Sequence, residues 1–152
     1  MTHAAPTPSE LQAYLHAHIP LSAAMDVRVL AVGPPELVLA VPLAPNLNHR
    51  GTAFGGSLVT AAILAGWSWL HVALRREGVD ARLVIQRQEM EYLSAVEAGF
   101  EAACAGPALS EFARFLQALR ARGRARTTLL VEVRCGGALV GRFSGDFVAL
   151  AR

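Results

Sequence analysis

Lysine is missing from this chain of 152 residues, in which all 14 basic side chains are arginines. Twelve acidic side chains nearly balance them, so that the formal net charge is only +2. A surface that binds nucleic acid needs a marked local excess of positive charge. The charge balance therefore favours a protein without a nucleic-acid partner.

Cysteine is scarce as well, with only Cys104 and Cys135 in the whole chain. The N-terminus lacks the basic segment followed by an apolar segment that marks a secretory signal. These two absences predict free thiols in a reducing compartment, the cytoplasm, with a disulfide as the alternative. The five histidines have no ligand spacing with Cys, Asp or Glu, so we expect no metal and no other cofactor.

One long apolar run is present, because residues 55–74 contain no charged side chain and are long enough for a membrane-spanning helix. Seven of its positions are nonetheless Gly, Ser, Thr or His, and strand-like patterns flank it on both sides. A helix that is apolar all round can instead be wrapped by protein. We expect such a buried helix and no membrane association.

The rest of the chain reads as short elements separated by turn residues. A helix should begin at residues 7–10, with Thr7 or Ser9 as its cap, and should end before Pro20. A second short helix should begin at a Ser110 cap and stop near Gly123. Alternating patterns predict strands at 25–32, 36–43, 80–93, 96–104, 126–135 and 139–150.

The last two strands should form a hairpin whose register depends on the length of its loop. A two-residue Gly136-Gly137 loop would pair Val131 with Arg142, whereas a three-residue loop that includes Ala138 pairs Val131 with Phe143. The second pairing keeps the apolar faces of both strands together. We therefore predict the three-residue loop.

Six strands and one helix that is apolar all round predict an α+β domain in which a curved antiparallel sheet wraps a long central helix. A row of small residues, Ser57, Ala61 and Ala65, would let this helix lie close to the sheet. We expect one domain over residues 1–152, with an N-terminal helix in 1–20 and the core in 22–150.

The order of these elements and the NHRGTAFGGSL segment that opens the central helix resemble the hotdog-fold thioesterases, most closely the family typified by the C-terminal thioesterase domain of YiiD. The resemblance runs from about Ser22 to the end of the chain. It implies a hotdog fold, acyl thioesters of coenzyme A or acyl carrier protein as substrates, and a homodimer or a tetramer.

The related phenylacetyl-CoA-type thioesterases carry an asparagine shortly before a His-Gly-Gly that opens the helix, and an acid about one and a half turns later. Asn48 stands at the asparagine position. Phe54 stands where the histidine would be, and Ile63 where the acid would be. The usual general base of the helix is therefore missing.

The residue types in this segment suit thioester chemistry. Gly55 and Gly56 would expose helix N-terminal N–H groups that polarise a carbonyl and stabilise an oxyanion, with Phe54 beside the substrate. Asn48 could orient the carbonyl or a water, and His49 titrates near neutral pH. The alternatives are close helix packing for the glycines, a loop cap for Asn48 and a solvent-facing His49.

A water-activating carboxylate would have to come from elsewhere. We predict Glu91 in this catalytic role and Glu89 beside the substrate, because in hotdog dimers this strand borders the partner's helix N-terminus; a solvated face paired with Arg87 is the alternative. Ser57 and Thr60 could hold a water at the substrate, although a bond from the hydroxyl to the helix backbone is the favoured use.

Three further groups are assigned less specifically. We expect His71 to be a buried structural histidine, and Trp67 and Trp69 to be core or dimer contacts. An arginine group could receive the phosphates of coenzyme A or the acidic face of a carrier protein, or could be a solvated helix end. Its members are Arg114, Arg120, Arg122, Arg124 and Arg126.

The sequence as a whole predicts a thioesterase that hydrolyses an acyl thioester. A non-catalytic module that binds acyl thioesters is the main alternative, since side chains other than the usual catalytic ones occupy two positions of the motif. A hotdog dehydratase is less well supported, because the glycine turn carries no matching histidine and carboxylate.

Overall fold

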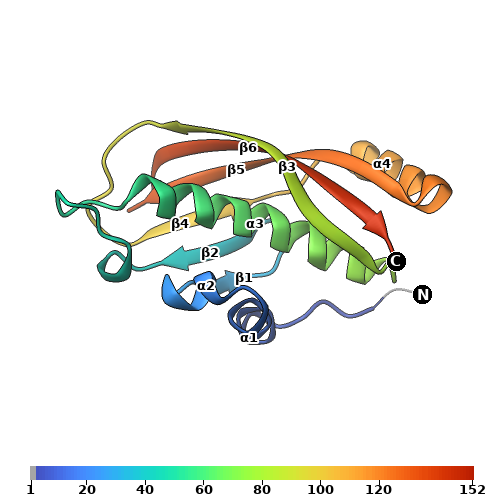
Figure 1. Cartoon of the computed structure of the whole chain (residues 1–152), viewed down its shortest axis with the longest axis horizontal. Coiled ribbons are helices and arrows are strands. Elements are labelled where there is room, and N and C mark those ends of the chain that lie inside the picture. Colours follow the sequence, from blue (N-terminus) through green and yellow to red (C-terminus); the bar gives the residue numbers. More distant parts are fainter. Residues whose placement is uncertain (1–2) are drawn as a thin grey trace.

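The structure of the protein is a computed structural model that describes residues 3–152. Six strands form one antiparallel sheet in the order β1-β2-β4-β5-β6-β3, and this sheet curves around helix α3 (Figure 1). The elements are α1 (Pro8–His18), α2 (Pro20–Ala24), β1 (Arg28–Ala31), β2 (Leu37–Val41), the 3-10 turn η1 (Ala44–Asn46), α3 (Gly55–Arg76), β3 (Ala81–Tyr92), β4 (Phe100–Cys104), α4 (Leu109–Arg122), β5 (Arg124–Cys135) and β6 (Ala138–Ala151). The predicted α+β architecture is confirmed.

Helix α3 contains the apolar run that is long enough for a membrane span. Of its most apolar window, 56% is buried inside the protein. Ala61 and Ala65, two members of the predicted row of small residues, are completely buried. The long apolar helix is therefore the core helix of the fold, as predicted.

The N-terminal helix begins and ends where the sequence predicts. Thr7 and Glu10 form a capping box, in which the Glu10 N–H donates to Thr7 Oγ1 at 3.2 Å and the Thr7 N–H donates to the Glu10 carboxylate at 2.8 Å. Helix α1 ends at His18, and the short helix α2, which was not predicted, follows at once.

Strand β4 is shorter than predicted because Val96 pairs with the loop before α3 and not with a strand of the sheet. The Val96 carbonyl accepts a hydrogen bond from the Ala53 N–H at 2.8 Å, in the loop before α3, and the strand begins only at Phe100. Strand β4 then pairs with β5 only between residues 101–103 and 132–134. Helix α4 packs against β5.

The predicted cap of α4 is wrong, whereas its predicted end is right. The Phe112 N–H donates to the Ala108 carbonyl at 3.0 Å, so that Ala108 is the N-cap and Ser110 already lies inside the helix. Gly123 ends the helix with φ 73°, a left-handed conformation that favours glycine.

The β5–β6 hairpin has the predicted register but not the predicted loop. Val131 pairs with Phe143, as expected. The loop has only two residues, because Cys135 pairs with Ala138. A bulge at Val140 supplies the extra residue that restores the pairing of the two apolar faces.

Strand β3 lies at an edge of the sheet and pairs only with β6. A bulge at Gln86 interrupts the pairing between Ile85 and Arg87. The bulge reverses the alternation, so that Ile85 faces α3 before it and Met90 faces α3 after it. The odd-numbered residues 87, 89 and 91 consequently lie on the outer face of the sheet.

The close approach of α3 to the sheet at Gly66 generates a prediction about stability. A Cβ atom on Gly66 would lie 3.0 Å from Cζ of the fully buried Phe147. We expect Gly66→Val to lower the free energy of unfolding by about 1–3 kcal/mol through overpacking, measured by urea denaturation. The control is Ala113→Val at an exposed α4 position, which should lower the free energy of unfolding by only a few tenths of a kcal/mol. Equal effects of the two changes would contradict the overpacking at Gly66.

Candidate active site

The loop before α3 is organised by the side chain of Asn48. Its Oδ1 accepts hydrogen bonds from the N–H groups of Arg50 at 2.8 Å and Thr52 at 3.1 Å, and its Nδ2 donates to Thr52 Oγ1 at 2.6 Å. The Asn48 N–H also donates to the Thr52 carbonyl at 2.8 Å. Asn48 therefore makes the bonds expected of a loop cap, and both polar atoms of its amide are engaged in them.

His49 lies in the turn that Asn48 closes, where the chain is exposed. Within residues 3–152 its ring forms no hydrogen bond. The structure therefore places His49 on the loop beside the start of α3, without fixing its ring against Gly55 or Gly56.

A second asparagine, Asn46, joins three segments and was missed by the sequence analysis. Its side chain is buried, and Nδ2 donates to the carbonyls of Met25 at 3.0 Å and Pro42 at 2.8 Å. The backbone carbonyl of Asn46 accepts a hydrogen bond from the Phe54 N–H at 2.8 Å. Asn46 thus fixes the residue from which α3 begins. No local pattern distinguishes a buried asparagine from the exposed polar residues around it.

The first turn of α3 leaves two backbone donors free. Phe54 is the N-cap, and its carbonyl accepts the N–H groups of Ser57 at 2.9 Å and Leu58 at 3.2 Å. Among the described residues, no acceptor meets the N–H of Gly55 or of Gly56. Unpaired N–H groups at the positive end of a helix dipole are suited to binding an anion or a polarised carbonyl oxygen.

Two aromatic rings lie over these glycines. The ring of Phe54 occupies the position that a Cβ atom on Gly56 would take, so glycine is required for this arrangement. The ring of Tyr92 comes within 3.4 Å of the Cβ position of Gly55, and its hydroxyl donates to the Gly55 carbonyl at 2.9 Å. Phe54 and Tyr92 are 57% and 51% exposed, so the site between them is open to solvent.

Tyr92 is the second functional candidate that the sequence analysis missed. It reaches α3 because the bulge at Gln86 turns Met90 and Tyr92 toward the helix. The sequence did carry one indication, since Met90 and Tyr92 alternate with the two acids of the strand.

The same bulge directs the acids of β3 away from α3. Glu91 pairs instead with Arg142 at 3.1 Å, and both side chains are 62% exposed. Glu89 lies on the same outer face, opposite Ser144 of β6. Within one chain, the structure therefore does not bring either carboxylate to the N–H groups of Gly55 and Gly56.

The hydroxyls near the start of α3 behave differently from each other. Thr60 Oγ1 donates to the Gly56 carbonyl at 2.7 Å, the backbone bond that the sequence analysis favoured. Ser57 makes no side-chain hydrogen bond within residues 3–152 and is half-buried. Ile63 follows on the helix, so no carboxylate lies in the first turns of α3.

The arginine group lies at the other end of α3, on α4 and the start of β5 (Figure 1). Arg120 donates to the carbonyl of Glu77 at 3.3 Å and lies 3.5 Å from its carboxylate. Trp69 packs edge to face against Phe112 of α4, with the ring centroids 5.4 Å apart. The structure therefore does not place the arginines beside Gly55 of the same chain.

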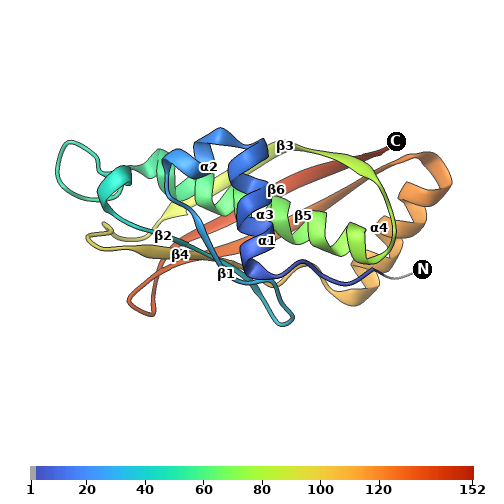
Figure 2. The ribbon, with the colours of Figure 1, turned by 90° about the horizontal axis from the view of Figure 1, so that it is seen from below.

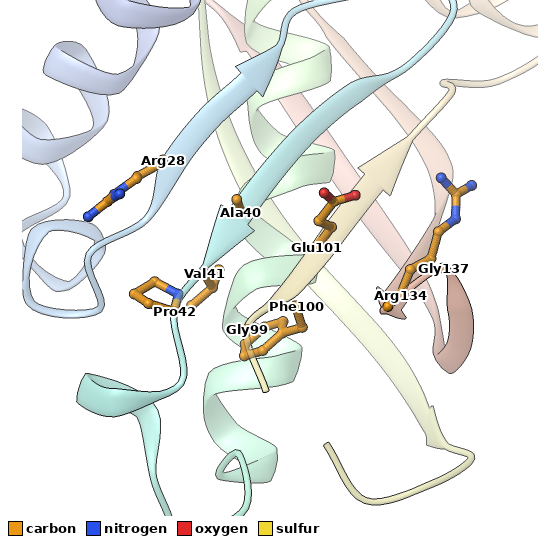
Figure 3. Close-up of a pocket in the computed structure, with 10 residues that line it drawn as sticks. Arg28, Ala40, Val41, Pro42, Gly99, Phe100, Glu101, Arg134 and Gly137 are labelled. Atoms are coloured by element: carbon orange, nitrogen blue, oxygen red, sulfur yellow. The ribbon is translucent and has the colours of Figure 1, made fainter. Parts of the chain in front are cut away.

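A cavity of about 370 Å³ lies on the outer face of the sheet, above Ala40 and Glu101 (Figure 3). Arg134 at its border is neutralised by Glu36 at 3.0 Å and Glu132 at 2.8 Å. Strands β2 and β4 separate the cavity from α3 (Figure 3). It is therefore distinct from the site at Gly55 and Gly56.

Solved structures show the same architecture. A protein of unknown function from Chlorobaculum tepidum is 27% identical, with a TM-score of 0.92 and coverage of 99% of this chain and 100% of that one. The "putative thioesterase" from Shewanella oneidensis is 29% identical, with a TM-score of 0.84 and coverage of 94% and 96%. A mutant of the phenylacetic acid degradation protein PaaI from Thermus thermophilus is also 29% identical, with a TM-score of 0.60 and coverage of 88% and 99%.

Residues 8–151 match the family described as "Putative thioesterase (yiiD_Cterm)". This match covers nearly the whole chain, including the loop before α3 and all six strands. The similar solved structures share the curved sheet and central helix of the hotdog fold. The chain therefore belongs to the putative thioesterase family of the YiiD C-terminal domain and has the hotdog fold.

Proposed function

We propose that the protein hydrolyses acyl thioesters of coenzyme A or acyl carrier protein, with the carbonyl oxygen bound by the N–H groups of Gly55 and Gly56. The single observation that carries this proposal is the pair of unpaired N–H groups at the start of a 22-residue buried helix. Membership of a thioesterase family supports the same reaction class.

In the proposed reaction, water adds to the thioester carbon and the carbonyl oxygen becomes an oxyanion between the two N–H groups. The carbon–sulfur bond then breaks, the thiol leaves after gaining a proton, and the acid remains. One preorganised donor to an oxyanion typically lowers the barrier by about 3 kcal/mol. The site also requires glycine at position 56, since a side chain there would displace the Phe54 ring.

Tyr92 is the hydroxyl that we place at the attacking water. The Tyr92 hydroxyl donates its hydrogen bond to the Gly55 carbonyl. The lone pairs of the Tyr92 oxygen therefore stay free to accept a hydrogen bond from a water at the mouth of the site. Asn48 holds the loop that carries His49, whose imidazole is the group that we propose as the proton acceptor. Glu91 and Glu89 would have to act on the site of a second subunit.

The acyl chain would follow the half-buried face of α3. Phe54, Ser57 and Thr60 line its start, and Val59, Ile63 and Trp67 continue along the helix. These side chains are at least partly exposed, whereas neighbours such as Leu58, Ala61 and Leu64 are buried. An apolar stripe that begins at the carbonyl-binding N–H groups suits an aliphatic acyl group.

The subunit is proposed to be a single domain over residues 1–152 that forms a homodimer through β3, with a tetramer as a further possibility. Residues from α1, α3, α4 and the sheet share one hydrophobic cluster. Strand β3 offers 12 residues of edge with Val84 44% exposed, and such an edge favours pairing with another strand. With two free thiols, the expected compartment is the cytoplasm.

A non-catalytic acyl-thioester binding module remains the second candidate function. The observation that favours it is the lack of any carboxylate near Gly55 and Gly56 within residues 3–152. In that case the N–H groups would bind the carbonyl without turnover.

Hydrolysis is tested with acyl-CoA and acyl-carrier substrates of different chain lengths, by following release of free thiol. We expect Asn48→Ala to lower kcat at least tenfold, because the loop loses the bonds that Oδ1 and Nδ2 make, and His49→Ala to lower it by a similar factor as a proton acceptor is lost. Wild-type turnover in both variants would refute their catalytic assignment. Tight binding of a non-hydrolysable acyl-CoA without turnover of the thioester would favour the binding module.

Tyr92→Phe removes one hydroxyl from the proposed water site. We expect kcat to fall about 10–100-fold with little change in KM, because the variant loses the hydroxyl at the water and its hydrogen bond to the Gly55 carbonyl but keeps the N–H groups that bind the substrate carbonyl. Thr128→Val is the matched control: it removes an exposed hydroxyl that bonds to Asp146 on the outer face, and its kcat should equal that of the wild type. An unchanged kcat in Tyr92→Phe would exclude the proposed role.

The dimer is tested by charge at the exposed edge. Val84→Asp places a negative charge on the edge strand of each subunit, so we expect it to shift the dimer toward monomer in analytical ultracentrifugation. Leu130→Asp adds the same charge on the outer face of β5, where Leu130 is 69% exposed, and should leave the dimer intact. Dissociation by Leu130→Asp alone would assign the interface to the outer face instead.

A further inference from the structure

Helices α1 and α3 meet in a column of four stacked rings. Tyr14 stacks on His18 with ring centroids 4.0 Å apart and on His71 at 4.8 Å, and His71 stacks on Trp67 at 4.8 Å. Figures 1 and 2 show α1 lying across α3. The proposed thioesterase reaction uses neither histidine.

A cavity of about 360 Å³ lies beside this column. Residues 4–6 form one wall, Leu11 and Tyr14 of α1 a second, and His71 and Arg75 of α3 a third. The N-terminal segment is held in place because the His3 N–H donates to the Arg76 carbonyl at 3.1 Å and the capping box fixes the start of α1. The cavity is therefore a defined part of the fold.

Three donors line this cavity without a protein acceptor. Within residues 3–152, neither the Tyr14 hydroxyl, nor a ring nitrogen of His71, nor the Arg75 guanidinium makes a hydrogen bond or ion pair. The one acid in the lining, Glu10, is engaged in the cap of α1, where it accepts the Thr7 N–H at 2.8 Å. The site is thus rich in donors and poor in acceptors.

The charges around His71 are mainly positive. Burial, together with the nearby Arg75 and His18, lowers the pKa of His71 from 6.5 to about 4. His71 is therefore neutral at neutral pH and offers one ring N–H. Arg75 supplies a permanent positive charge on the same side of the cavity.

We propose that this cavity binds the carboxylate of a small aliphatic acid. The carboxylate oxygens would accept hydrogen bonds from Arg75, Tyr14 and His71, and the aliphatic part would lie against Leu11 and residues 4–6. The site is separate from Gly55 and Gly56: His71 lies 15 residues beyond Gly56 on one helix, which is about 22 Å along its axis. This inference does not depend on the thioesterase proposal.

The test uses the full chain and hexanoate as the probe, with hexanol as an uncharged compound of the same length. We expect hexanoate to shift the ring resonances of His71 in a saturable way in NMR, and to raise its pKa from about 4 toward 6.5, because a bound carboxylate stabilises the imidazolium. Hexanol should cause neither change.

Variants identify the binding group. Arg75→Gln should weaken hexanoate binding at least about tenfold, since hydrogen bonds to a charged partner are the strong ones. Arg82→Gln removes an exposed arginine of β3 and should bind as the wild type does; melting curves of both variants show that they are folded. Absence of a saturable His71 shift, equal binding of hexanol, or unchanged affinity in Arg75→Gln would each overturn the proposal.

Discussion

The structure depends on the burial of α3, a helix of 22 residues whose side chains are apolar on nearly every face. Burying such a helix requires apolar partners around most of its circumference, and a flat sheet covers only one side. The six strands therefore curve around it, and Gly66 allows a close contact with Phe147. Val59, Ile63 and Trp67 remain partly exposed on one face of the helix.

This arrangement also explains why the two proposed sites lie toward the ends of α3. The sheet covers the middle of the helix, whereas its N-terminal N–H groups stay accessible between Phe54 and Tyr92. Buried Asn46 fixes this start through the carbonyls of Met25 and Pro42. A rigid helix held in this way presents its two free donors at constant positions, which is what stabilisation of an oxyanion requires.

Near the C-terminal end, α3 meets a different set of partners. Tyr14 of α1 stacks on His71, and burial of the imidazole, together with the nearby Arg75 and His18, lowers the pKa of His71. The site at Gly55 offers backbone donors, whereas the cavity at His71 offers side-chain donors beside a permanent charge. The two proposed anion sites on this helix therefore differ in the origin of their donors.

The sequence by itself determined the features that depend on neighbouring residues: the capping box of Thr7 and Glu10, the glycine that ends α4, and the glycine pair that opens α3. The resemblance of the loop to hotdog thioesterases added the family. Only the tertiary structure decided which side chains meet at the site. The bulge at Gln86 turns Tyr92 toward α3 and Glu91 away from it, because one extra residue reverses every side chain that follows in a strand. Such a bulge reflects pairing with a distant strand, which local sequence patterns do not contain.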